Sequence, residues 1–321
     1  MINKLFAVIF TVLLVAGCSN QQQDDIFKAV VEAGRDSAGL VKKQEKALDV
    51  EMVYLERMPE GEAKGPTIVL AHGFSANKDT WIRFITAIDK KYHVIAIDWA
   101  GHGDNERDLN GNYDLFQQAD RLHALMQAKG INKFHLAGNS MGGAISAIYA
   151  MKYPNELASL ALMNSAGIDG KNKSEYFQAL EKGSNPLIAS DLESFDYRMG
   201  FTMSQPPFLP WPLKPALVRI TLSRFDINNK IFNDMMGTKE RLEGEDFHQK
   251  LVDLAAQNPI PTLIMWGEED RVLDVSAVEE FQKLLPHAEV KVYEGVGHLP
   301  MMEIPNKSAE FYESFVAKAE S

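Results

Sequence analysis

The stretch FHLAGNSMGGA, residues 134–144, places Ser140 between glycines that lie two residues away on either side. The apolar residues before Gly138 are typical of a buried strand, and AISAIYAMKY after Gly143 is typical of a helix. The chain must turn sharply between them, so the Ser140 side chain is expected to point outward. A hydroxyl presented in this way can act as a nucleophile if a base activates it. A tight turn that merely carries a solvated serine is the alternative.

Two further side chains could activate Ser140. Asp270 lies three residues after the predicted strand TLIMWG, and His298 lies four residues after the predicted strand AEVKVYE. Open parallel sheets build their sites at the carboxyl ends of strands, where both residues fall. The G-x-S-x-G pattern is typical of the nucleophile elbow of α/β-hydrolases, in which the acid and the histidine follow the serine in this order. We therefore predict that Ser140 is the nucleophile, His298 its base and Asp270 the orienting acid.

Other acids and histidines fit these roles less well. Glu268, Glu269 and Asp274 share the loop of Asp270, and any of them could be a solvated surface acid. His102 precedes Ser140 in the chain, which is the wrong order for this fold, and is expected to make structural turn contacts. Because the sequence has no HExxH motif, cysteine cluster or paired histidine spacing, neither a metal nor a cofactor is expected.

A reacting ester also needs an oxyanion hole. Attack on its carbonyl places negative charge on the oxygen, and two backbone N–H groups can hold that charge. Met141 follows the nucleophile at the start of its helix, where the helix dipole also favours an anion. In the segment AHGFSANKD, Gly73 lets the backbone bend close to the substrate, and Phe74 would donate the second N–H. We predict that Phe74 and Met141 form the oxyanion hole.

These residues require a sheet whose strands alternate with helices. Apolar or alternating runs predict strands at residues 50–57, 67–71, 92–98, 134–137, 157–165, 261–267 and 288–294. Helical spacing predicts helices at residues 80–89, 112–130, 144–153 and 275–285, and from residue 306 onward. The alternation predicts an α/β fold, with a mainly parallel sheet and helices on both faces.

The alternation is interrupted between residues 167 and 258. This segment contains QPPFLPWPLKP, a proline-rich piece that can be neither a regular helix nor a central strand. Its large apolar residues, a few of which are expected to face the active site, include Phe195, Tyr197, Met199, Phe201, Met203, Phe208 and Trp211. We predict a helical cap at residues 167–258, inserted into an α/β-hydrolase core of residues 49–166 and 259–321. An ordinary set of surface helices is the alternative.

Composition limits the partners. A chain of 321 residues, 45% of them hydrophobic, suits one large domain or a domain with an insertion. The formal net charge of −11 argues against a nucleic-acid partner and against attraction to anionic lipid as a main binding force. A neutral ester or lipid substrate remains compatible with this charge, and the oligomeric state is not predicted.

The N-terminus is predicted to be a targeting segment. Lys4 precedes the apolar run Leu5–Ala16, which is too short for an ordinary membrane-spanning helix. The run leads into VAGC, which resembles the lipobox of bacterial lipoproteins, and Cys18 is the only cysteine of the chain. We predict a signal peptide at residues 1–17, lipid attachment at Cys18, and a polar tether with a peripheral helix at residues 18–48. A plain signal peptide with an incidental cysteine, or an uncleaved membrane anchor, is the alternative.

The lipobox resemblance also carries an expectation about location. Ser19 follows the cysteine, where bacterial inner-membrane retention usually uses Asp. The resemblance therefore implies a protein of the bacterial cell envelope, held by a lipid anchor in the outer membrane. A periplasmic or secreted protein is expected if the anchor is absent.

Five motifs together resemble those of the α/β-hydrolase superfamily, and more narrowly those of monoacylglycerol-lipase-type enzymes and cold-active bacterial lipases. They are IVLAHGFSANKDTW, AIDWAGHGDN, HLAGNSMGGA, WGEEDRV and VGHLPMME. The resemblance implies a serine hydrolase that cleaves carboxylic esters, above all acylglycerols, through an acyl-enzyme. Within this fold the alternatives are a short-chain carboxylesterase and a carbon–carbon-bond hydrolase. A binding lipoprotein that keeps the fold without the chemistry is the alternative outside the enzymes.

Overall fold

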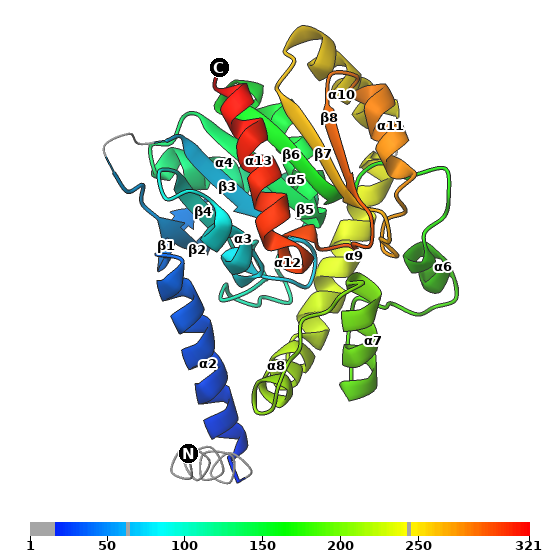
Figure 1. Cartoon of the computed structure of the whole chain (residues 1–321). Coiled ribbons are helices and arrows are strands. Elements are labelled where there is room, and N and C mark those ends of the chain that lie inside the picture. The colour runs from blue at the N-terminus through cyan, green and yellow to red at the C-terminus, as the bar shows by residue number, and fades with distance from the viewer. Residues whose placement is uncertain (1–16, 62–64, 243–244) are drawn as a thin grey trace.

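The computed structural model describes residues 17–61, 65–242 and 245–321 (Figure 1). Within these residues the strands form one eight-stranded sheet in the order β1-β2-β4-β3-β5-β6-β7-β8. The strands are β1 Val41–Ala47, β2 Val50–Arg57, β3 Thr67–Ala71, β4 His93–Ile97, β5 Phe134–Ser140, β6 Leu157–Ser165, β7 Thr262–Gly267 and β8 Glu289–Tyr293. Strand β2 runs antiparallel to β1 and β4, whereas the pairings from β4 to β8 are parallel. The predicted α/β fold with a mainly parallel sheet is confirmed.

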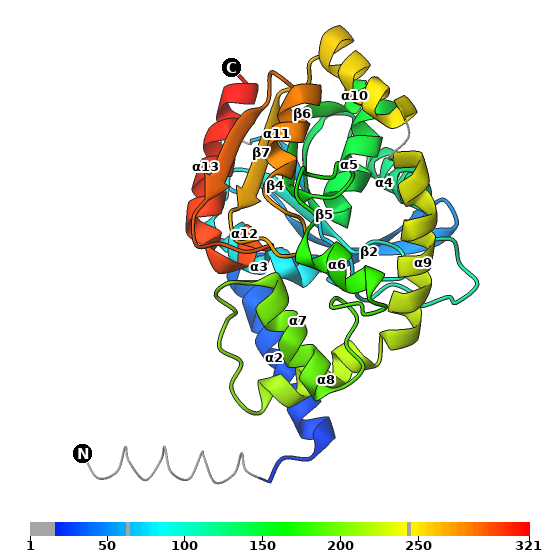
Figure 2. The same ribbon diagram turned by 90° about the vertical axis from the view of Figure 1, so that its right-hand side faces the viewer.

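Helices cover both faces of the sheet (Figure 2). Helices on the first face are α4 Leu115–Ala128, α5 Met141–Lys152, α10 Glu245–Gln257 and α11 Ala277–Leu284. Helices on the second face are α3 Ile82–Ala87, α12 Pro300–Glu303 and α13 Pro305–Ala319. Leu122, Ile145 and Phe281 are buried in the first layer, and Phe84 and Tyr312 in the second. Because the central strands are covered on both sides, they read as continuous apolar runs in the sequence.

The segment before the sheet is more regular than the sequence suggests. Residues expected to form a polar tether begin helix α2, Asn20–Ser37, and a capping box between Ser19 and Gln22 satisfies backbone groups of its first turn. The chain then turns at Gly39, whose φ of 69° suits glycine, and enters β1. The tether prediction is therefore wrong from residue 20, and residues 18–48 supply an edge strand as well as a helix.

The segment between β6 and β7 is helical, as expected. It contains α6 Glu175–Glu181, α7 Leu192–Thr202, α8 Leu213–Leu222 and α9 Phe225–Leu242, and we call these four the inserted helices. They gather at the carboxyl ends of the strands (Figure 1). Helix α10 differs, because its Phe247 and Leu251 are buried in the layer that covers the sheet. Residues 245–257 therefore pack with the core, although the predicted cap included them.

The proline-rich stretch is irregular over most of its length. It has no helix or strand from residue 205 to residue 212. Helix α8 begins at Leu213, and it can include Pro215 because proline is tolerated in the first turn of a helix. Short 3₁₀ helices occur at η1 Lys78–Trp81 and η2 Pro154–Glu156.

The predicted targeting segment lies largely beyond the structure. The apolar run Leu5–Ala16 falls outside the described residues, as does nearly all of the predicted signal peptide. In the part of the chain that the structure describes, no helix combines the length and the apolar character needed to cross a membrane. Cys18 lies just before α2, and its carbonyl accepts a hydrogen bond from the Gln23 side chain at 3.0 Å.

Candidate active site

Ser140 lies on a strained turn between β5 and α5. Its φ of 56° and ψ of −122° fall outside the regions that most side chains adopt. Two close approaches allow this turn. A Cβ atom on Gly142 would lie 2.5 Å from the Ala71 carbonyl oxygen, and one on Gly73 would lie 2.9 Å from the Ser140 Cβ. Only glycine fits at these two positions, so the elbow can press against the end of β3.

The side chains of His298 and Asp270 form a hydrogen-bonded pair. The distance from His298 Nδ1 to Asp270 Oδ2 is 2.7 Å, and both residues are buried. The other oxygen, Asp270 Oδ1, accepts the backbone N–H groups of Val272 and Leu273 at 2.8 and 3.0 Å. Because Nδ1 donates to the carboxylate, the Nε2 atom of His298 carries the lone pair that can accept a proton.

Hydrogen bonds hold the backbone of His298 beside the Ser140 elbow. Its carbonyl accepts a hydrogen bond from Asn139 Nδ2 at 3.1 Å, and Asn139 is the residue before Ser140. Its N–H donates to the Thr202 carbonyl at the end of α7 at 2.9 Å. Among the described residues, no hydrogen bond joins the Ser140 hydroxyl to the His298 imidazole. Such bonds are often long in unliganded enzymes and tighten when substrate binds.

The turn that carries Phe74 is fixed by the histidine before it. His72 Nδ1 lies 2.7 Å from the Gly73 carbonyl oxygen, and His72 Nε2 accepts the Trp99 backbone N–H at 3.2 Å. This pairing requires a neutral imidazole, and complete burial lowers the pKa of His72 to about 3. Because the Gly73 carbonyl and the Phe74 N–H belong to one planar peptide, holding the carbonyl also sets the direction of that N–H.

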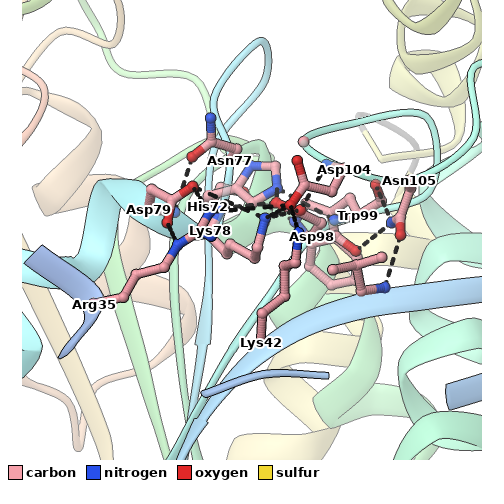
Figure 3. A network of polar contacts seen from close by, with 12 residues as sticks. Arg35, Lys42, His72, Asn77, Lys78, Asp79, Asp98, Trp99, Asp104 and Asn105 are labelled. Carbon is pink, nitrogen blue, oxygen red and sulfur yellow. Dashed lines mark hydrogen bonds and ion pairs between the residues drawn. The ribbon is translucent and has the colours of Figure 1, made fainter. Parts of the chain in front are cut away.

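A buried ionic network supports the same turn (Figure 3). Lys78, in η1, donates to Asp98 at 2.7 Å and to Asp104 at 3.0 Å, and neither Lys78 nor Asp98 is exposed to solvent. Burial disfavours the charge on Lys78, but the carboxylates of Asp98, Asp79 and Asp104 outweigh it and raise the Lys78 pKa. Arg35 of α2 adds a paired contact to Asp79, with distances of 2.7 and 2.8 Å. The turn is thereby tied to β4 and to the N-terminal helix.

An apolar cavity begins at Ser140. Ser140, Phe74 and Met141 line one part of it, and its remaining lining includes Leu115, Ala144, Phe177, Leu187, Met235 and Leu273. The large apolar residues singled out in the sequence do not line this cavity. Phe195 packs in a separate small cluster with Ala189 and Val218, and Phe208 and Trp211 are exposed. The inserted helices face the cavity instead through α6 and α9, whose Tyr176, Phe177, Met235 and Met236 side chains line it.

The rival candidates lie in other environments. His102 is buried behind the Phe74 turn, where burial lowers its pKa well below the ordinary range, so it stays neutral. Glu268 and Glu269 are exposed, while Asp274 accepts the backbone N–H of Ser276 at 2.9 Å. Among the described residues, no group of three or more acids, histidines or cysteines is arranged to hold a metal ion.

Comparisons with known proteins agree with the observed fold. A family model for the alpha/beta hydrolase fold matches residues 66–305. Lipase 1 of Psychrobacter immobilis is 32% identical over 315 residues, which cover 97% of this chain and 95% of that protein. Human monoacylglycerol lipase ABHD6 is 30% identical over 261 residues, covering 78% of this chain and 75% of that protein. The crystal structure of a bacterial membrane phospholipase A superposes with a TM-score of 0.87 and 35% identity, covering 100% of both chains.

Proposed function

The chain belongs to the α/β-hydrolase fold family, and from this premise we infer that it is a serine hydrolase of the lipase and esterase type. We propose that it cleaves the carboxylic esters of acylglycerols through Ser140, His298 and Asp270. The observation that carries this assignment is the 2.7 Å bond between His298 and Asp270, next to a serine elbow of left-handed φ. A base that is already oriented, beside a serine held out of the regular backbone, is what ester attack requires.

The proposed reaction has two halves. In the first, His298 Nε2 removes the Ser140 proton as the oxygen attacks the acyl carbon, and the N–H groups of Phe74 and Met141 hold the oxyanion. His298 then gives that proton to the leaving alcohol, which departs from the acyl-enzyme. In the second half, His298 activates a water molecule, and its attack releases the acid and restores Ser140. Asp270 keeps the imidazole in one tautomer and stabilises its charged form throughout.

The acyl chain is proposed to occupy the apolar cavity at Ser140. The cavity lining is almost entirely apolar, which suits a hydrocarbon chain better than a polar acid. The relatives named lipase and monoacylglycerol lipase support the same substrate class. A short-chain carboxylesterase or a carbon–carbon-bond hydrolase would share the triad and remains the second candidate. The inserted helices supply part of the cavity wall, so we propose that they act as the cap of this enzyme.

The triad assignment is tested by comparing the wild-type protein with Ser140→Ala. The variant is expected to lose ester hydrolysis by several orders of magnitude, as removal of a catalytic serine does. It should also resist labelling by a serine-reactive phosphonate that labels the wild-type protein. Retention of activity or labelling in the variant would overturn the assignment. A panel of esters with graded acyl length, including mono-, di- and triacylglycerols, separates a lipase from a short-chain esterase.

Membrane attachment is proposed to occur through a lipid on Cys18. The support is the lipobox-like VAGC in the sequence and the position of Cys18 just before α2, at one end of the described structure. Outer-membrane attachment is the more specific form of this proposal, and it rests on Ser19. In a bacterial host, Cys18→Ala should move the protein from the membrane fraction to the periplasmic or secreted fraction. Unchanged fractionation would contradict the anchor.

A further inference from the structure

Among the described residues, Arg198 on helix α7 has no carboxylate partner. Its only protein acceptor among the described residues is the Ser75 carbonyl oxygen, 2.9 Å from Nη2. Its Nε is buried without a hydrogen-bond partner, whereas the side chain as a whole keeps some exposure. Burial lowers the pKa of Arg198 to about 10, so the guanidinium is still charged at neutral pH. A deep charge without a partner is unfavourable in the free protein unless an anion joins it.

Arg198 makes fewer contacts with the protein than three other arginines in or near the inserted helices. Arg219 on α8 contacts Asp24 of α2, and Arg271 in the loop of Asp270 contacts Glu175 of α6. These pairs involve exposed or half-exposed side chains that join secondary-structure elements. Arg224 is buried and also lacks a carboxylate partner in the part of the chain that the structure describes, but it donates to two backbone carbonyls, those of Gly101 and Gly103. Arg198 donates to one carbonyl only, so most of its five N–H groups have no acceptor among the described residues.

A second donor lies beside Arg198. The Ser75 hydroxyl oxygen accepts a hydrogen bond from Asn228 Nδ2 of α9 at 3.1 Å. Its own hydrogen is therefore free to point to another acceptor, and Ser75 is partly exposed. Ser75 has a φ of 58°, so this residue is held in a left-handed conformation directly after Phe74. Two donors of different types, the Arg198 guanidinium and the Ser75 hydroxyl, therefore lie at the turn that carries Phe74.

Helix α7 contacts both the turn of Phe74 and the backbone of His298. Arg198 contacts the turn of Phe74, and one helical turn later the Thr202 carbonyl accepts the N–H of His298. No residue of α7, all of which the structure describes, lines the apolar cavity, whose walls include residues of α4, α5, α6, α9 and the loop of Leu273. If the acyl chain fills that cavity, the alcohol part of the ester extends in another direction, and Arg198 lies on a helix that contacts both the turn of Phe74 and the backbone of His298.

We propose that Arg198 and the Ser75 hydroxyl bind the phosphate of a phosphorylated glycerolipid, whose ester is cleaved at Ser140. This inference rests on the proposed function, because it assigns the headgroup of the same substrate. A planar guanidinium with several free N–H groups matches the oxygens of a phosphate, and a hydroxyl can add a further bond. In such lipids the phosphate and the ester are attached to the same three-carbon glycerol, so an anion site beside the oxyanion turn is within reach.

The test compares two substrates that differ only in the phosphate. The purified full chain is assayed with 1-acylglycerol and with the 1-acylglycerol 3-phosphate of the same acyl chain. The wild-type protein should cleave the phosphorylated substrate. In Arg198→Met the ratio of kcat/KM, phosphorylated over neutral, should fall about tenfold or more, which is the effect of losing one hydrogen bond to a charged group. Arg198→Lys keeps the charge and should recover part of the ratio, and Ser75→Ala should lower it by a smaller factor.

Controls separate the headgroup assignment from other roles. Arg107→Met removes an exposed arginine that contacts Ser223, and it should leave the ratio unchanged. If Arg198 only latches α7 to the Ser75 turn, both substrates lose rate equally, and the constant ratio overturns the proposal. If inorganic phosphate inhibits 1-acylglycerol cleavage through Arg198 while the ratio stays constant, the site binds a free anion and the proposal is also overturned. Ser140→Ala should lose activity with both substrates. That loss tests the proposed function, whereas the substrate ratio in Arg198→Met tests the headgroup site, so the two proposals can fail separately.

Discussion

The side-chain nitrogen of Asn164 lies 2.7 Å from the Oδ2 atom of Asp270, the same oxygen that accepts the hydrogen bond from His298. Asn164 is the last residue but one of β6, and Asp270 lies just after the adjacent strand β7. The φ of Asn164 is 43°, a left-handed value that asparagine tolerates better than most residues. The bond holds the same carboxylate oxygen that accepts from His298, so Asn164 acts as a positioning residue for the pair.

We expect Asn164→Gly to lower kcat/KM for a monoacylglycerol by about tenfold, the effect of losing one hydrogen bond to a charged group. Glycine accepts the left-handed backbone, so this change removes the donor without adding strain. The loss should be far smaller than that of Ser140→Ala, because the triad remains. Steady-state kinetics measures the effect, and circular dichroism checks that the fold is intact. An unchanged kcat/KM would show that Asp270 needs no support from Asn164.

Gly73→Ala is expected to reduce kcat by about a hundredfold or more. The new Cβ would lie 2.9 Å from the Ser140 Cβ and 3.2 Å from the Asn139 side-chain oxygen, so either the elbow or the Phe74 turn must shift. A displacement of about 1 Å in a catalytic group is enough for a loss of this size. Steady-state kinetics on one ester, with urea unfolding to measure stability, tests this expectation.

Gly237→Ala is the matched control for that change. Gly237 lies in helix α9, and a Cβ there would meet nothing within 4 Å. The same chemical change should therefore leave activity intact and stabilise the helix by about 1 kcal/mol, the difference between glycine and alanine in a helix. Equal activity in the two alanine variants would mean that close packing at Gly73 has no role in catalysis.

Sequence patterns predicted the parts of the molecule that local rules determine. The strands from β2 to β8 are continuous apolar or alternating runs, so periodicity identifies them. Ser140 has glycines at fixed spacing, and Asp270 and His298 follow strand ends, so their approach could be inferred from the topology of a parallel sheet. The structure brings Asp270 and His298 within hydrogen-bond distance, as their positions suggested.

Other features depend on contacts between distant residues and gave no local signal. Asn164 is separated from Asp270 by 106 positions, and Arg198 from Ser75 by 123. An asparagine near the end of a strand, or an arginine in a helix, gives no sign of such a role until its neighbours are known. Strand β1 was missed for a related reason. Its residues VKKQEKA are mostly exposed at an edge, so they lack the apolar alternation that marks the other strands.

The neutral state of His72 makes the stability of the fold depend on pH. The folded-state pKa of about 3 lies below the ordinary value of 6.5, so the unfolded chain binds more protons between these values. Stability is therefore complete above about pH 6.5 and falls as the pH drops toward 3, by up to about 1.4 kcal/mol per pH unit for one such group. His102, whose pKa is also lowered by burial, adds a dependence of the same sign.

His72→Asn is expected to make this dependence shallower. Asparagine can keep a donor near the Gly73 carbonyl but does not titrate, so one of the two contributions disappears. The free energy of unfolding, measured with urea at pH 7, 6 and 5, should fall less steeply in the variant, by up to about 1.4 kcal/mol per pH unit. The variant should be less stable than the wild-type protein at pH 7, because the Trp99 N–H loses its acceptor. Parallel pH curves for the two proteins would mean that His72 binds protons equally in the folded and unfolded states, and the neutral imidazole inferred for the Phe74 turn at low pH would then be wrong.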